Sequence, residues 1–258
     1  MGNKFLFLHI PKNGGTSLRD LMSGWFASER TCPYRIGQDY SANFTDLDLE
    51  KYDYFTGHIP AALAQKFFSN DMPKLTVLRH PVDRIYSQYA YWRAYDLPES
   101  NILEQGEKGQ IPTLYAAELQ GPLMAKQHSF GSFLFSNHEY IQRVLTNPQA
   151  RYLCEASQVN KIGSMEPQVA LDGILRNIEK MNITVAVLEN QPHLTRTLES
   201  FAALFGIDGE IVLPHSNKSE REFFEGLDEE RIAMYLRQIS PLDFPLYEHF
   251  RQQTAAAI

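Results

Sequence analysis

Residues 4–17, KFLFLHIPKNGGTS, carry the clearest structural pattern in the chain. Residues 4–10 form a nearly continuous apolar run that Pro11 ends, which predicts a buried strand of a parallel sheet. A turn-rich loop follows, and a helix then buries one apolar face made by Leu18, Leu21, Met22, Trp25 and Phe26. Strand, glycine-bearing loop and helix are the first half of a βαβ unit.

Three further apolar segments predict the other strands, at residues 52–56, 75–78 and 183–188. Pro81 is well placed to open a helix after the third strand. Apolar residues at helical spacing predict a helix after the fourth strand and two more at the end of the chain, near residues 228–239 and 244–252, before a frayed tail at 254–258. This alternation predicts an α/β protein with a P-loop-like three-layer fold, in which helices flank a central parallel sheet.

The pattern loosens between residues 97 and 163, where Gly, Pro, Ser and Asn recur. We interpret residues 1–258 as one domain and the 97–163 segment as an insertion that carries acceptor specificity; the alternative is that the segment is only more scaffold. The preceding aromatic residues are partly a core stripe, and the outward members are candidates for the wall of an acceptor cleft: Tyr86, Tyr89, Tyr91, Trp92 and Tyr95.

Composition excludes several classes of protein. The 258 residues are 43% hydrophobic and 21% charged, as in ordinary globular proteins, and the net charge of −7 argues against a general attraction to nucleic acid or to anionic membranes. Cys32 and Cys154 imply no disulfide framework. No secretory signal or membrane-spanning run is visible. We therefore expect a cytoplasmic protein, while its oligomeric state cannot be read from the chain.

The loop between the first strand and the first helix has the composition of an anion-binding site. Paired glycines let backbone N–H groups approach an anion, the helix N-terminus adds donors, and a lysine and two hydroxyl side chains complete the set. The structural alternative is a tight turn with helix-capping Thr and Ser. The residues that we expect to contact the ligand are Lys12, Asn13, Gly14, Gly15, Thr16 and Ser17.

This loop is not a Walker A motif, because its lysine lies before the glycines and not directly before the hydroxyl residue. The strand at 75–78 ends in Arg79, where a nucleotide kinase often places a magnesium-binding aspartate. Arg79 and Ser87, two turns into the next helix, form a pair that suits a phosphate monoester. The alternative is a surface arginine and an ordinary helical serine.

Together these segments resemble the sulfotransferases that use 3′-phosphoadenosine-5′-phosphosulfate (PAPS), especially the carbohydrate 2-O- and 6-O-sulfotransferases and their bacterial relatives. FLFLHIPKNGGTSL is similar to the family's 5′-phosphosulfate loop, with Asn13 at a position that is usually threonine. TVLRHPVDRIYSQY resembles its 3′-phosphate motif. FTGH, ending at His58, is similar to the segment with the catalytic histidine, and NPQARYLCE and DFPLY resemble later family segments.

The resemblance implies in-line transfer of a sulfuryl group from PAPS to a hydroxyl, with adenosine 3′,5′-bisphosphate (PAP) as product and no metal required. Lys12 would stabilise charge on the leaving oxygen, and His58 would be the general base, although a structural histidine is the alternative there. Arg79 and Ser87 would hold the 3′-phosphate. Arg151 and Ser219 are further candidate nucleotide contacts, with a polar surface loop as the alternative for Ser219.

Two other functions stay open. A nucleotide-dependent kinase on a related P-loop fold would need magnesium and a nucleoside triphosphate, and the missing Walker lysine and aspartate count against it. A non-catalytic nucleotide-binding module would keep the loop and lose the base. For the acceptor we expect a neutral or weakly charged hydroxyl compound (a carbohydrate, a glycolipid or a small metabolite), because the chain is acidic overall and the 97–163 segment carries six glutamates against five cations.

Overall fold

The computed structural model describes residues 4–33, 49–95, 119–208, 210–213 and 228–256. The chain divides into two compact units. The first unit comprises Met1–His80, Asn147–Asn217 and Pro241–Ile258, and the second comprises Pro81–Thr146 and Lys218–Ser240. The first segment of the second unit therefore begins before the predicted insertion at 97–163 and ends inside it, at Thr146, and the unit also takes in a later segment of the chain.

The first unit contains a parallel four-stranded sheet with the order β2-β1-β3-β4. Its strands are β1 (Phe5–Leu8), β2 (Tyr54–Gly57), β3 (Lys74–Leu78) and β4 (Ile183–Val187). Both ends of each strand lie within two residues of the predicted ends. The agreement arises because each strand is a buried apolar run with polar or turn-forming residues beside it. The predicted α/β class with a parallel sheet is confirmed.

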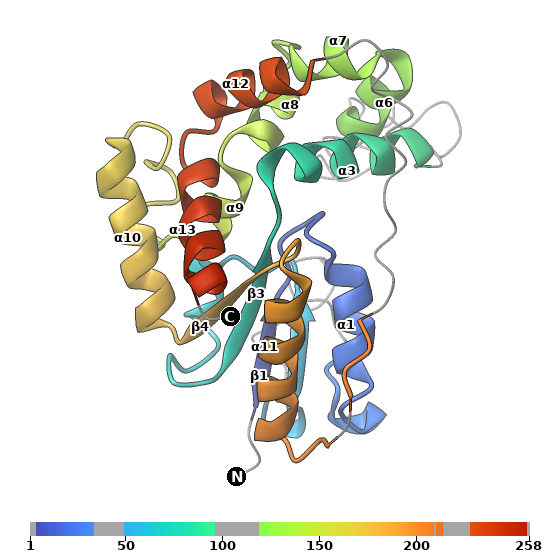
Figure 1. The fold of residues 1–258 in the computed structure, drawn as a ribbon, viewed down its shortest axis with the longest axis vertical. Helices are drawn as coiled ribbons and strands as arrows, with labels where there is room; N and C mark the ends of the chain where they lie inside the picture. The colour runs from blue at the N-terminus through green and yellow to red at the C-terminus, as the bar shows by residue number, and fades with distance from the viewer. Residues whose placement is uncertain (1–3, 34–48, 96–118, 209, 214–227, 257–258) are drawn as a thin grey trace, which may run out of the picture. The chain divides into compact units, whose positions relative to one another are not determined.

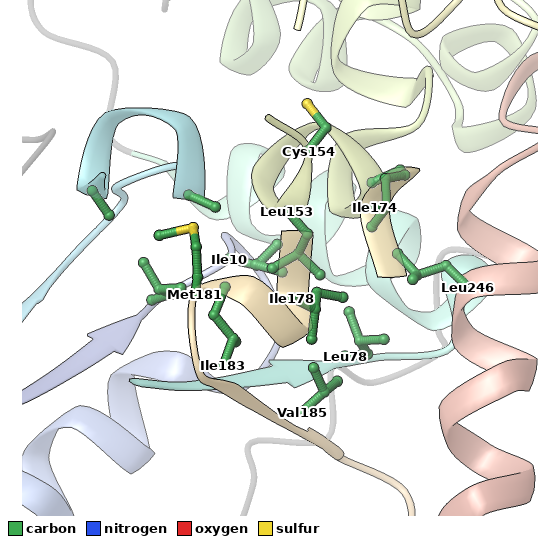
Figure 2. Close-up of a cluster of buried hydrophobic side chains, with 14 of the residues drawn as sticks. Ile10, Leu78, Leu153, Cys154, Ile174, Ile178, Met181, Ile183, Val185 and Leu246 are labelled. Atoms are coloured by element: carbon green, nitrogen blue, oxygen red, sulfur yellow. The ribbon is translucent and has the colours of Figure 1, made fainter. Parts of the chain in front are cut away.

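Helices cover both faces of this sheet, because strand side chains alternate between two separate clusters of buried apolar residues. Phe5 and Phe7 of β1 belong to the cluster that includes α1 (Gly15–Ser23) and α11 (Gln191–Leu204). Leu6 and Leu8 point the other way, into the cluster that Figure 2 draws in close-up. Helices α9 (Pro148–Leu153), α10 (Pro167–Lys180) and α13 (Asp243–Ala256) contribute to that second cluster through Leu153, Ile174, Ile178 and Leu246.

Figure 1 shows further helices of the first unit around the sheet. Their bounds are α2 (Ala61–Ala64), α9 (Pro148–Leu153), α10 (Pro167–Lys180) and α13 (Asp243–Ala256), with 3₁₀ turns at Ser28–Arg30 and Leu49–Lys51. The predicted frayed tail is wrong at Thr254, which is buried in α13 and whose hydroxyl accepts a hydrogen bond from Asn190 Nδ2 at 3.1 Å.

The second unit is helical in its described part and has an aromatic core. Its helices are α3 (Pro81–Ala94), α6 (Gln120–Gln127), α7 (Phe130–Leu134), α8 (Glu139–Leu145) and α12 (Glu229–Ile239). In this core, Tyr86, Tyr89 and Trp92 of α3 pack in tilted and edge-on contacts against Phe130 and Phe133, with ring centroids 5.0–5.8 Å apart. These three aromatic residues are therefore core, whereas Tyr91 is 49% exposed and Tyr95 half-buried.

Candidate functional site

The carboxyl ends of the four parallel strands lie at one edge of the sheet, and the predicted polar residues of the first unit follow three of them. His9 comes after β1, His58 after β2, and Arg79 after β3. The chain goes from β1 to β2 on one side and then to β3 on the other, so the strand order reverses between β1 and β3. In open α/β sheets, ligands bind at this reversal, outside the carboxyl ends of the strands.

The loop after β1 begins with a tight turn that forces Lys12 into an unfavourable backbone conformation. The N–H of Asn13 donates to the carbonyl oxygen of Ile10 at 3.3 Å, and Lys12 has a φ of 70°. Pro11 in the second position and a left-handed residue in the third are the pattern of a type II turn, where glycine or asparagine is usual. For lysine the left-handed region costs about 1–2 kcal/mol. Such strain concentrates at functional sites.

Both glycines of the loop are required by their surroundings. Gly14 has a φ of 76°, and a Cβ there would lie 2.9 Å from Cδ1 of Leu188, directly after β4. A Cβ on Gly15 would lie 1.9 Å from Cδ2 of His9. The backbone of the loop is therefore packed against residues that follow β1 and β4, and neither glycine tolerates a side chain.

The first turn of α1 presents its donors without a side-chain cap. Gly14 is the N-cap residue, and no side chain among the described residues caps the helix. Capping therefore does not account for Thr16 and Ser17. The side chain of Thr16 is exposed and that of Ser17 is half-buried. Uncapped N–H groups and the positive end of the helix dipole favour an anion at this position.

The structure brings Arg79 to the loop, although 67 positions separate it from Lys12. Arg79 Nη1 donates a hydrogen bond to the backbone carbonyl oxygen of Lys12 at 3.1 Å. Both side chains are partly exposed. Two cations from separate motifs thus flank the same loop, which concentrates positive charge at this edge of a protein whose net charge is −7.

His58 contacts a second histidine, His9, which lies just before the loop. Its ring makes an edge-on contact with the ring of His9, with centroids 4.5 Å apart and an interplanar angle of 74°. His9 is buried and stacks on Phe7. The sequence predicts a core or loop-orienting histidine at position 9, and the ring of His9 fills the space that a side chain on Gly15 would occupy. His58 is half-buried and remains accessible.

Asn13 has a different position from the one that the sequence predicted. Its side chain is 1% exposed, and Nδ2 donates to the carbonyl oxygen of Val77 at 2.7 Å and to Gln149 Oε1 at 2.8 Å. The buried Oδ1 atom has no hydrogen-bond partner among the described residues. Asn13 therefore anchors the loop to β3 and α9, and a direct contact with phosphate stays a prediction.

Glu189 is a carboxylate that follows β4, the strand beside β3 at this edge of the sheet. Glu189 Oε1 accepts a hydrogen bond from the N–H of His80 at 3.0 Å, and Oε2 accepts one from the hydroxyl of Tyr247 at 3.2 Å. Burial, and then the charge of Glu189, raise the pKa of Tyr247. The ring of His80 packs edge-on against Phe244 and Tyr247, so His80 is a packed turn residue.

The other predicted contacts lie elsewhere. Ser87 is buried in α3 of the second unit, and Ser219 lies outside the described residues. Arg151 is in α9 of the first unit; its Nε atom is buried and has no hydrogen-bond partner among the described residues. Their roles as nucleotide contacts stay predictions.

Comparison with known proteins gives no family assignment. No family model matches the chain. No curated protein matches it either. Among solved structures, it is similar to the crystal structure of a sulfotransferase from Alicyclobacillus acidocaldarius, with 15% sequence identity and a TM-score of 0.42 over 96% of this chain and 99% of that one.

Proposed function

We propose that the protein is a sulfotransferase that transfers a sulfuryl group from PAPS to a hydroxyl group of an acceptor. The observation that carries this proposal is the contact between Arg79 and the backbone of Lys12, at the reversal point of a parallel sheet. It supports one ligand with two anionic ends, one bound by the loop and one by the arginine. PAPS carries a phosphosulfate on the 5′ side of its ribose and a phosphate on the 3′ side.

In this proposal the loop binds the phosphosulfate. The amides at the start of α1 and the ammonium of Lys12 surround the bridging oxygen, on which negative charge develops as the sulfur–oxygen bond breaks. The sulfuryl group moves to the acceptor oxygen on the opposite side, and PAP leaves with the bond electrons. The strain at Lys12 has a reason here, because the turn fixes the start of the lysine side chain beside the anion.

Arg79 holds the 3′-phosphate. A guanidinium has five N–H donors in a fixed plane, which suits the bidentate binding of a phosphate monoester. The bond from Arg79 Nη1 to the carbonyl oxygen of Lys12 sets the distance between the two anion sites. Ser87, from the family resemblance, stays a candidate second donor.

His58 is proposed as the general base. Histidine is the side chain whose ordinary titration lies nearest neutral pH, and it takes the proton that the acceptor hydroxyl loses when it attacks sulfur. The half-buried position at the end of β2 leaves His58 accessible, and the edge-on contact with His9 restricts its ring. For the acceptor we propose a neutral or weakly charged hydroxyl compound, such as a carbohydrate, a glycolipid or a small metabolite.

Thermal shift with PAP, AMP and ATP–magnesium side by side, each at the same concentration, tests the proposal, because the ligand that binds the folded protein most tightly stabilises it most. We expect the largest shift with PAP. A larger shift with ATP–magnesium would favour the kinase. Transfer from labelled PAPS to neutral glycans and small alcohols, in the presence of EDTA, then separates an enzyme from a binding module. Activity that needs restored magnesium would contradict the proposed mechanism.

A further inference from the structure

Gln149 occupies a central place in the site and lies in NPQARYLCE, the stretch that resembles a later family segment. It lies in α9 of the first unit and is 0% exposed. Its Oε1 atom accepts hydrogen bonds from Asn13 Nδ2 at 2.8 Å and from the N–H of Arg79 at 3.0 Å. Its Nε2 atom donates to the carbonyl oxygen of Arg79 at 2.9 Å. One amide thus binds both the loop and the backbone of the arginine.

These contacts close a ring of four residues. Arg79 Nη1 donates to the carbonyl oxygen of Lys12, Lys12 is bonded to Asn13 through the chain, and Asn13 bonds to Gln149. Gln149 pairs with both backbone polar groups of Arg79, as a neighbouring strand would. It therefore extends the hydrogen bonding of β3 by one residue, at the point where the chain leaves the sheet. The positions of the loop and of Arg79 are thereby set together.

The backbone of Gln149 is itself held firmly. The carboxylate of Asp243, in the first turn of α13, accepts hydrogen bonds from the N–H of Gln149 at 3.2 Å and of Ala150 at 2.9 Å. Asp243 is 1% exposed and caps α9 at its positive end. Asn147 Oδ1 accepts a further bond from the N–H of Leu242 at 2.9 Å. The hydrogen bonds to Asp243 thus fix the backbone of Gln149, as the precise support of a binding site requires.

We propose that Gln149 is a positioning residue that sets the spacing between the anion site of the loop and that of Arg79. This role rests on the proposed function. A ligand with two anionic groups gains from both sites only when their spacing matches its own, so the preference for PAP over AMP depends on Gln149. A buried amide with all of these partners has no alternative orientation, because turning it would set donor against donor and acceptor against acceptor.

The test measures the dissociation constants of PAP and AMP by calorimetry and compares their ratio among variants. The wild-type protein is expected to prefer PAP by at least about tenfold, as a charge-assisted contact implies. Gln149→Met keeps the length of the side chain and removes all three bonds, and the preference is expected to fall about tenfold. The matched control is Asn177→Leu, which removes a buried amide that bonds to Leu153 and Gln65 in the same unit.

The control is expected to lose thermal stability as Gln149→Met does and to keep the wild-type preference for PAP. Gln149→Glu is a second variant, which retains the acceptor and removes the donor to Arg79; about a threefold loss of preference is expected. If Gln149→Met does not fold, the ratio of dissociation constants measured for Gln149→Glu tests the proposal. A folded Gln149 variant with the full wild-type ratio would overturn the role of Gln149. A wild-type ratio near one would instead overturn the proposed function, and this role with it.

Discussion

The two edges of the sheet use lysine in opposite ways. At the amino edge, Lys74 opens β3 with 0% exposure, and its Nζ donates to the carbonyl oxygens of Ser69, Asn70, Met72 and Met181 at 2.8–3.2 Å. At the carboxyl edge, Lys12 is partly exposed and sits in a left-handed conformation. The first cation stabilises the ends of the chain segments around it. The second is held at a cost in backbone energy, which fits the anion-binding role that we propose for it.

The two edges also differ in what surrounds the charge. Lys4, before β1, resembles Lys74, because its ammonium bonds to the carbonyl oxygen of Leu49 at 2.9 Å and to Glu50 at 2.8 Å. At the carboxyl edge, Lys12, Arg79 and two histidines gather around one loop. A cation is therefore informative about function only together with its backbone conformation and neighbours.

The largest expected effect is on catalysis at the carboxyl edge. His58→Ala should lower the turnover number about 10²–10⁴-fold, as for loss of a general base. The affinity for PAP should stay the same, because the proposed base contacts the acceptor and not the nucleotide. Steady-state kinetics with labelled PAPS and calorimetry with PAP measure the two quantities. His249→Ala, on α13, is the control, and normal turnover in His58→Ala would remove His58 from the mechanism.

A substitution at Lys12 should separate activity from stability. Lys12→Gly removes the cation and relieves the left-handed strain, since glycine adopts a φ of 70° without penalty. We expect turnover to fall about 10²–10³-fold, as for loss of one transition-state contact. The melting temperature should equal or exceed that of the wild type. A variant that is both active and no less stable would show that Lys12 has no part in transfer.

The opposite result is expected at the amino edge. Lys74→Met leaves several buried carbonyl groups without their donor, which costs about 1–3 kcal/mol of unfolding free energy. Urea denaturation measures this loss, and the turnover of the protein that remains folded should be close to that of the wild type. Lys66→Met, at an exposed position, is the matched control and should change neither quantity. A Lys74→Met variant that loses turnover and keeps its stability would contradict the assignment of a structural role to the amino edge and a catalytic role to the carboxyl edge.

The sequence was sufficient for those parts of the fold and site that depend on neighbouring residues. Continuous apolar runs placed all four strands, and the glycine loop and Arg79 were found as motifs. Their contact across 67 positions follows from parallel strands, whose carboxyl ends share one edge. No prediction was made for α10, although Pro167 at its start and the apolar spacing of Ala170, Ile174 and Ile178 are a usable signal.

The residues that the sequence did not reveal are those whose partners are distant in the chain. Gln149 bonds to Asn13 and Arg79, 136 and 70 positions away, and a polar residue in a short helix carries no sign of this. The predicted third strand begins at Leu75 and excludes Lys74, because a lysine at a strand end is normally solvated. Thr254 was read as part of a tail, because the bond from Asn190 depends on where α13 packs.

The smallest expected effect is a pH dependence of stability from the amino edge. Burial lowers the pKa of Lys74 to about 8, from an ordinary value of 10.5, and the charge of Asp71 opposes this shift. The folded protein therefore loses this proton before the unfolded chain does. Between pH 8 and 10.5 unfolding takes up a proton, so the free energy of unfolding rises with pH.

The upper limit of this slope is one proton, about 1.4 kcal/mol per pH unit. We expect a fraction of that limit, because four carbonyl oxygens around Nζ favour the charged ammonium. Urea denaturation of the wild type and of Lys74→Met from pH 7.5 to 10 measures the difference, in which the contributions of other groups cancel. A difference that does not change with pH would mean that Lys74 keeps its proton throughout, held by the carbonyl oxygens despite its burial. A measurable rise would mean that desolvation prevails, and that the amino edge tolerates a neutral amine where the mechanism proposed for the carboxyl edge requires a charge.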